Sequence, residues 1–290
     1  MRTWNGPMKG LVCSFAALAA FTAPAAAQST YTWNTTAGSA WLTAANWSGT
    51  PTNFPGLTGN STGNNAGDQA VFGSTLPAGL AVDIDMGNGA GRARQLLQLG
   101  AITFANTSND LVIGNSSTNK DGILQLNGAT VTIAGVPTAN VILYNSSSSQ
   151  MLTIQNTANG GTQTMGVALG ATTSIVNVAG GGTIAIPSIV SETAGGSKGI
   201  TLSGAGTLQL SSANTYTGAT TVSGGTLSAV NSTGSATGTG AVTVSAGGRL
   251  AGTGAVVPNT GAQATNTVTV AGKVQPGTDA ATGYLTLGSA

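Results

Sequence analysis

Asp83 and Asp85 are the two side chains whose type and spacing come nearest to a chemical site. They alternate with apolar residues, and residues two apart on a β-strand point to the same face, with their side chains about 6 to 7 Å apart. Two carboxylates at this separation are compatible with cleavage of a glycosidic bond or with weak Ca²⁺ binding. The pair is therefore the candidate site of a polysaccharide-active lyase or hydrolase.

The same run has a purely structural interpretation. Val82, Ile84 and Met86 alternate with the two aspartates, so a strand that buries these three residues leaves both carboxylates on its exposed face. The chain also contains no histidine, which removes the commonest general base and metal ligand and excludes a Ser-His-Asp or Cys-His site. We favour the structural interpretation and predict a non-enzymatic protein with no catalytic, cofactor-binding or metal-ligating residue.

Tryptophans mark a second candidate site, because Trp33, Trp41 and Trp47 all fall within residues 28–72. Flat indole faces stack on sugar rings, so the three side chains suit a carbohydrate-binding surface. Alternatively, they form a cap, since the end of a repetitive β fold exposes an unpaired strand edge and an open core that natural solenoids cover with an atypical segment. We favour the cap and keep carbohydrate binding as the alternative.

Composition and charge narrow the class of protein. Glycine accounts for 45 of 290 residues and charged residues for only 5%, which is unlike an ordinary cytosolic enzyme. Without Arg2 and Lys9 of the N-terminal segment, six basic residues face seven acidic ones. A nearly neutral surface does not collect phosphates by charge, so we expect no nucleic-acid partner.

The N-terminus has the features of a secretory signal peptide. Arg2 and Lys9 provide the positive region, residues 11–21 the apolar region, and residues 25–27 the small residues of a cleavage site before Gln28. The apolar region is too short for a membrane crossing, which needs about 20 residues. We therefore predict that residues 1–27 are removed on export and that no transmembrane segment remains.

Beyond the signal peptide, short apolar runs alternate with polar turns. Residues 124–126 and 131–133 alternate in hydropathy, as on a pleated strand with one inward and one outward face. Separators such as residues 180–182 supply the glycines that tight corners need. No segment shows a helical apolar stripe with caps, so the sequence predicts an all-β protein with very little helix.

Residues 200–227 contain the clearest internal repeat. Gly206-Thr207-Leu208 recurs as Gly225-Thr226-Leu227 after about 19 residues, a period that fits one coil of a β-solenoid. Weaker copies at residues 243–250 and 267–274 extend the repeat toward residue 287. The spacing predicts that strands of successive coils stack on one another at intervals of about 20 residues.

This stretch resembles the autotransporter-associated β-strand repeat of bacterial surface proteins. The resemblance lies in residues 202–208, in Asn214-Thr215-Tyr216-Thr217-Gly218 and in residues 220–227, and directly covers about a tenth of the chain. The aromatic segment before residue 72 is similar to the one that often precedes such repeats. The resemblance implies a right-handed parallel β-helix exported to the cell surface, and it brings no catalytic residue with it.

Together these observations predict an all-β protein folded as a right-handed, single-stranded parallel β-helix, or β-solenoid, with an N-terminal aromatic cap. We expect a signal peptide at 1–27, a capping segment at 28–72 and β-helix repeats at 73–290. The predicted function is that of a secreted or cell-surface stalk or passenger segment with an adhesive or interaction surface. The expected partners are surface glycans or other cell-surface proteins of a Gram-negative-type bacterium, with any outer-membrane anchor outside this chain and no cofactor.

Overall fold

The computed structural model describes residues 28–34, 40–49, 53–58, 65–73, 75–84, 95–115, 122–157, 164–258, 266–277 and 282–288. In these residues the chain is built from strands, and the only helical element is a single 3₁₀ turn, η1 (Ala44–Asn46). The predicted all-β class with very little helix is thus confirmed for the described part of the chain. The predicted signal peptide, residues 1–27, lies outside the described residues.

Two large sheets, here called sheet A and sheet B, form most of the molecule. The strands of sheet A are β1 (Thr30–Trp33), β2 (Trp47–Ser48), β4 (Gln69–Phe72), β7 (Ala101–Phe104), β10 (Ala129–Ile133), β11 (Val136–Asn145), β14 (Thr173–Val178), β17 (Gly199–Gly204), β19 (Thr220–Val222), β21 (Val242–Val244) and β24 (Val268–Val270). The strands of sheet B are β5 (Ala81–Asp83), β8 (Leu111–Asn115), β12 (Met151–Thr157), β15 (Thr183–Ile186), β18 (Thr207–Leu210), β20 (Gly225–Ala229), β22 (Gly248–Gly252) and β25 (Lys273–Pro276).

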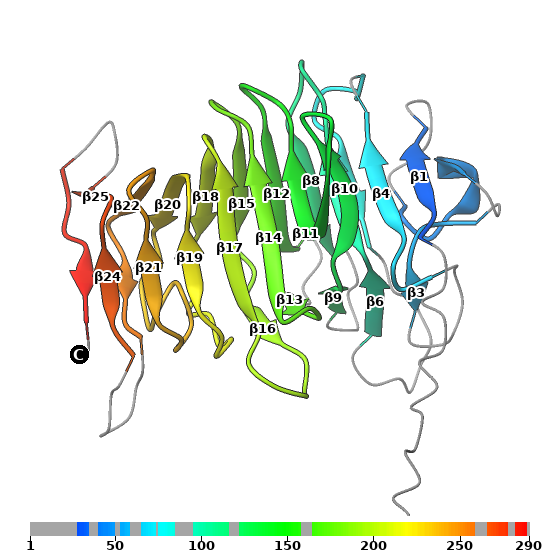
Figure 1. The fold of residues 1–290 in the computed structure, drawn as a ribbon. Helices are drawn as coiled ribbons and strands as arrows, with labels where there is room; N and C mark the ends of the chain where they lie inside the picture. The colour runs from blue at the N-terminus through cyan, green and yellow to red at the C-terminus, as the bar shows by residue number, and fades with distance from the viewer. Residues whose placement is uncertain are drawn as a thin grey trace, which may run out of the picture.

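Two smaller sheets, sheet C and sheet D, complete the fold. The strands of sheet C are β3 (Leu57–Thr58), β6 (Gln95–Leu99), β9 (Gly122–Leu126), β13 (Met165–Leu169) and β16 (Val190–Glu192), and those of sheet D are β23 (Ala255–Val256) and β26 (Thr286–Leu287). The strands of each large sheet lie side by side along the stack, from the β1 end to the β24 end (Figure 1).

Successive coils stack in parallel register, as the repeat predicts. Thr207 of β18 pairs with Thr226 of β20, and Leu208 pairs with Leu227, so the pairing offset equals the offset between the two repeat copies. Because the pairing is parallel, the chain must cross to another sheet and return before each new strand is added. The arrangement is consistent with the predicted β-solenoid.

Coils nearer the N-terminus are longer than the repeat predicts. Leu143 of β11 pairs with Ile102 of the preceding coil and with Val176 of the following one, and both partners are far more distant in sequence than Thr207 is from Thr226. The additional residues form the strands of sheet C and the antiparallel pair of β10 with β11. The prediction of coils of about 20 residues was therefore wrong in this part, because these coils also contain the strands of sheet C or the β10–β11 pair.

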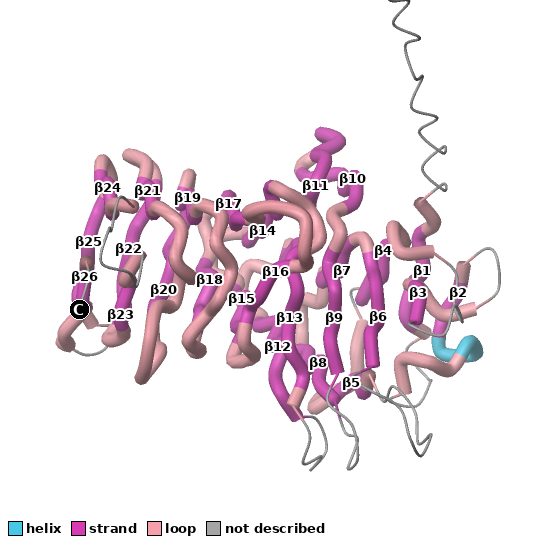
Figure 2. The backbone as a smooth tube through the Cα atoms, turned by 90° about the horizontal axis from the view of Figure 1, so that it is seen from below, coloured by secondary structure: helices cyan, strands magenta, loops and turns pink. Residues whose placement is uncertain are grey.

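Inward-facing side chains form continuous ladders between the sheets. Leu152, Ile184, Leu208, Leu227 and Leu250 occupy paired positions in successive strands of sheet B, and each is fully buried. Burial of one such side chain contributes about 1.5 to 3 kcal/mol. Figure 2 shows the strands of the two large sheets as separate rows. The buried side chains of the ladder belong to one hydrophobic core cluster.

Candidate functional site

Asp83 lies at the end of β5, between two fully buried neighbours. Val82 and Ile84 have no exposed surface, whereas Asp83 is partly exposed, so the expected alternation is seen here. The main chain of Asp83 is part of the fold, since its carbonyl oxygen accepts a hydrogen bond of 2.8 Å from the backbone N–H of Trp41. Asp85 lies outside the described residues. The pairing of the two carboxylates therefore stays a prediction.

The amino-acid sequence did not indicate the structural role of the Asp68 carboxylate. It is fully buried, and it accepts backbone hydrogen bonds from Ser29 at 3.2 Å, Gly56 at 3.2 Å and Asn65 at 2.8 Å. Burial raises the pKa of the Asp68 carboxyl, and these hydrogen bonds oppose that shift. The three donors are scattered along the sequence, so no local motif marks this residue. Its contacts connect three parts of the N-terminal segment.

A second carboxylate, Glu192, closes a loop after β16. It accepts a hydrogen bond of 2.7 Å from the Thr217 hydroxyl and another of 2.7 Å from the backbone N–H of Lys198. Partial burial acts to raise the pKa of Glu192, but these hydrogen bonds and the charge of Lys198 outweigh it and lower the pKa.

Among the described residues, no group of three or more acidic, histidine or cysteine side chains is placed to hold a metal ion. Within the same residues, no helix has the length and apolar character of a membrane span.

The three tryptophans pack against one another inside the N-terminal end of the stack. Trp33 is 2% exposed, Trp41 is fully buried and Trp47 is 6% exposed. The ring centroids of Trp33 and Trp47 lie 4.8 Å apart in an edge-to-face arrangement, and Phe72 contacts all three rings. Trp47 donates its Nε1–H to the carbonyl of Trp41 at 2.8 Å. The ring faces are therefore occupied by other aromatic side chains.

Asn214 lies in the polar stretch between β18 and β19, and its side chain is nevertheless buried. It is 5% exposed. Its Oδ1 accepts a hydrogen bond of 2.7 Å from the backbone N–H of Val190, and its Nδ2 donates to the carbonyl of Ala236 at 2.6 Å. Val190 and Ala236 belong to the preceding and following coils. The Asn214 side chain thus joins three consecutive coils at a point where no strand pairing satisfies these backbone groups.

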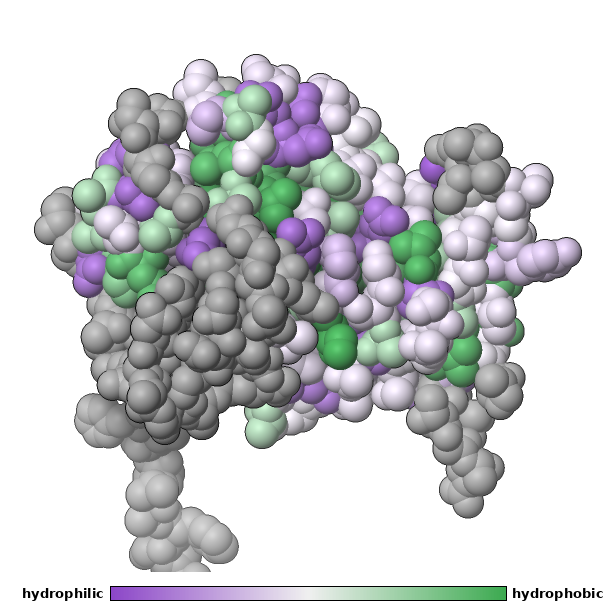
Figure 3. Space-filling view, turned by 180° about the vertical axis from the view of Figure 1, so that it is seen from behind, coloured by the Kyte–Doolittle hydropathy of each residue, from purple (hydrophilic) through white to green (hydrophobic). Residues whose placement is uncertain are grey.

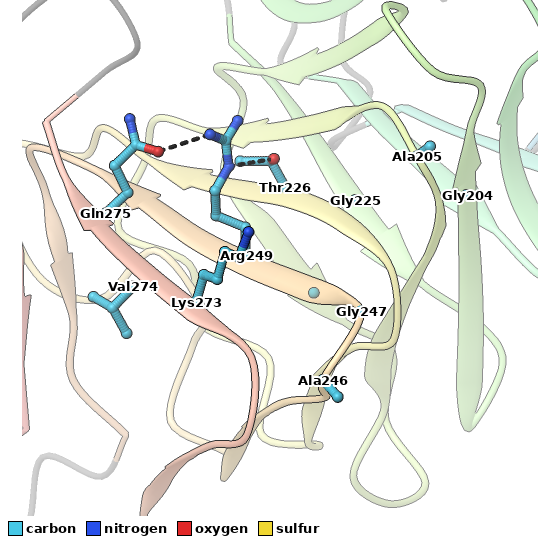
Figure 4. A pocket seen from close by; sticks show the side chains of 11 residues that line it. Gly204, Ala205, Gly225, Thr226, Ala246, Gly247, Arg249, Lys273, Val274 and Gln275 are labelled. Carbon is cyan, nitrogen blue, oxygen red and sulfur yellow. Dashed lines mark hydrogen bonds between the residues drawn. The ribbon is translucent and has the colours of Figure 1, made fainter.

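An open groove lies along the corners where the chain passes from sheet A to sheet B. Its volume is about 760 Å³, and it is lined by three successive corners, at residues 204–205, 225 and 246–248, and by side chains of β20, β22 and β25. Arg249 lies in this groove with Lys273 beside it on the next strand (Figure 4). Arg249 donates from Nε to the Thr226 hydroxyl at 2.9 Å and from Nη1 to Oε1 of Gln275 at 2.7 Å.

Glycines form the floor of this groove because the coil corners approach one another closely. Gly225 has a φ of +66°, and a Cβ there would lie 2.4 Å from the carbonyl oxygen of Gly206 in the preceding coil. A Cβ on Gly248 would lie 2.4 Å from the carbonyl oxygen of Val222. Only glycine fits such contacts without a backbone shift. The fold thus requires the glycines, and the hollow follows from their missing side chains.

The basic residues in the groove continue a ladder of threonines. Thr183, Thr207 and Thr226 occupy paired positions on β15, β18 and β20, and Arg249 and Lys273 take the same position on β22 and β25. Sequence reasoning missed this site. The signal was present, because aligning the repeat copies places Thr226, Arg249 and Lys273 in one column.

Part of the chain matches a known protein family. Residues 200–229 match the family model described as passenger-associated-transport-repeat. This confirms the predicted relation of this stretch to the autotransporter passenger repeats. No curated protein and no solved structure matches the chain.

Proposed function

We propose that the chain is a passenger segment of an exported protein, displayed at the surface of a Gram-negative-type bacterium, whose β-solenoid presents an interaction surface. The passenger-associated repeat at residues 200–229 carries this proposal. Its coil continues in parallel register on both sides, through β15 before it and β22 after it. The repeat is thus one part of a longer stack rather than an isolated motif.

The stacked coils suit a stalk that holds a surface away from the cell. No single coil can bury its own apolar residues, so the stability of each coil depends on its contacts with the neighbouring coils. Outward positions carry small polar residues such as Thr201, Thr221 and Thr243, which occupy paired positions in sheet A. The coloured part of the face in Figure 3 is mostly pale, with hydrophobic residues in small separate areas. Such a surface suits contact with polar partners such as glycans or other surface proteins.

The proposal includes a right-handed coil and three regions: a signal peptide at 1–27, a cap at 28–72 and coils at 73–290. Support for the cap comes from the buried cluster of Trp33, Trp41 and Trp47 and from the antiparallel pairing of β1 with β2, which occupies the outer edge of sheet A. Changing Trp47 to alanine should unfold the N-terminal coils. If glycan binding weakened while the fold stayed intact, a carbohydrate-binding surface would replace the cap.

Export is tested with the full chain produced in a Gram-negative host. We expect the exported protein to begin at Gln28 by N-terminal sequencing and to be cleaved by protease added to intact cells. A matched variant with Leu18 changed to arginine, which interrupts the apolar region of the signal, should stay inside the cell. Retention of the unaltered chain in the cytoplasm with Met1 in place would refute export.

The same proposal holds that the segment catalyses no reaction. A turnover screen on plant and algal glycans, run with the native chain and with an Asp83→Asn/Asp85→Asn variant, tests this directly. We expect no product from either protein. Product release that depends on the two carboxylates would instead establish the polysaccharide-active alternative.

A further inference from the structure

The two basic residues of the corner groove lie at directly paired positions. Arg249 of β22 is in register with Lys273 of β25, and parallel strands lie about 4.8 Å apart. Like charges directly opposite each other on neighbouring strands destabilise a sheet. The preceding coils have threonine at this position, so the fold itself does not require a basic residue there. An anion held between the two side chains would offset their repulsion.

The guanidinium of Arg249 is held in place before any ligand arrives. Its hydrogen bonds to Thr226 and Gln275 come from the coils on either side, and the Thr226 side chain is 8% exposed. Figure 4 shows Arg249 between these two residues, with the groove running past it toward the glycine corners. A fixed guanidinium suits a planar carboxylate, which it can bind through two parallel hydrogen bonds.

We propose that this groove binds a carboxylate-bearing glycan, with Arg249 and Lys273 as the anion-binding residues. The inference rests on the proposed function, since a glycan partner presumes a surface-exposed segment. Arg249 would hold one carboxylate, and Lys273 would supply a second positive charge one coil further along.

The shape and polarity of the groove favour a linear glycan over other anionic polymers. The groove crosses four coils, which corresponds to roughly 14 Å along the stack. Its corner residues at 204–205 and 246–247 are small and exposed, so a sugar ring can approach the backbone closely. Lys198, the other basic residue within the described part of the chain, is buried. A duplex nucleic acid needs many phosphate contacts, and two clustered charges do not supply them.

Binding is tested by calorimetry on the purified chain without its signal peptide. The probe is an oligogalacturonate, and its methyl ester is the matched neutral ligand with the same sugar backbone. We expect the acid to bind and the ester to bind at least tenfold more weakly. Affinity should also fall when sodium chloride is raised from 50 to 500 mM, because salt screens exposed charges.

Three variants assign the binding to the groove. Arg249→Gln should weaken binding roughly tenfold, and Arg249→Lys should restore part of it, since the charge remains but the planar fork is lost. Lys273→Gln should weaken binding severalfold without altering the fold, because Lys273 is exposed. Lys120→Gln, which removes the same charge elsewhere in the sequence, is the control and should bind within twofold of the unaltered chain.

Several results would overturn the proposal. Equal affinity for acid and ester would show that charge is not recognised, and equal losses in the Lys120 and Lys273 variants would remove the groove from consideration. Preference for a poly-glutamate peptide would indicate an acidic protein partner, and complete competition by inorganic phosphate at equal concentration would indicate a phosphate site. Because binding is measured on purified protein, failure here leaves the export result standing, and failure of export leaves a binding result standing.

Discussion

Asn214 provides the sharpest test of how this solenoid is held together. Its side chain accepts a hydrogen bond from Val190 and donates one to Ala236, at 2.7 and 2.6 Å. Both partner residues have no exposed surface. Changing Asn214 to alanine therefore leaves one buried N–H and one buried carbonyl without the partners they have now.

The expected cost follows from these two groups. A buried backbone group that loses its partner costs about 1 to 3 kcal/mol, so the variant should lose about 2 to 6 kcal/mol of the free energy of unfolding. Asn266 is the matched control, because its Nδ2 donates to the carbonyl of Thr239 at 2.8 Å but at an exposed position. Changing Asn266 to alanine should cost no more than about 0.5 kcal/mol, since water can replace the side chain.

Two measurements check this prediction. Coil stacks need not unfold in one step, so guanidinium denaturation should be combined with amide hydrogen exchange, which reports on individual coils. The N–H of Val190 should exchange roughly thirtyfold faster or more in the Asn214 variant, as expected from a loss of about 2 kcal/mol or more. If the two variants proved equally stable and Val190 kept its protection, the inferred bridging role would be refuted.

Two further predictions concern a corner and a loop. Gly206→Ala should lower the free energy of unfolding by about 1 to 3 kcal/mol, because the new Cβ would lie 2.2 Å from the carbonyl oxygen of Ala179. Gly73→Ala is the control and should be nearly neutral, because a Cβ there would have no atom within 4 Å. The denaturation midpoints of the two variants test this difference. Glu192, which accepts a hydrogen bond from the Lys198 backbone, has a lowered pKa, so its stabilising contribution is present above its ordinary value of 4.5 and is lost as the pH falls through the folded value. The stability difference between the unaltered chain and Glu192→Gln should therefore shrink between pH 7 and pH 3, and a constant difference would contradict this.

The repeat and its register could be predicted from the amino-acid sequence. Thr207 and Thr226 align in the two repeat copies, and their strands pair at that same offset. The same holds for Val222 and Val244, which the weaker copy aligns. This works because in a solenoid the contacts of each residue lie one period away, so the spacing of similar residues along the chain is also their pairing in space.

Part of the candidate site could also be predicted from the sequence. Aligning the repeat copies places Arg249 and Lys273 at the outward position held by Thr226, and the parallel register makes them neighbours. That they line a hollow was not predictable, because the hollow depends on how closely the glycine corners approach. The bonds from Arg249 to Thr226 and Gln275 likewise depend on the rotamers of long side chains.

Features that follow no period became visible only in three dimensions. The strands of sheet C and the longer coils depend on contacts such as those of Leu124 with Leu97 and with Val167, which lie at unequal distances from it in the sequence. Two further examples lie in the N-terminal segment, which does not repeat. Asp68 is buried and accepts hydrogen bonds from three backbone donors that are separate in the sequence, and Trp41 is buried against another aromatic ring. In the repeats, the spacing of similar residues in the sequence predicts which residues are in contact. Outside the repeats, the contacts depend on side-chain packing, which the spacing of residues does not indicate.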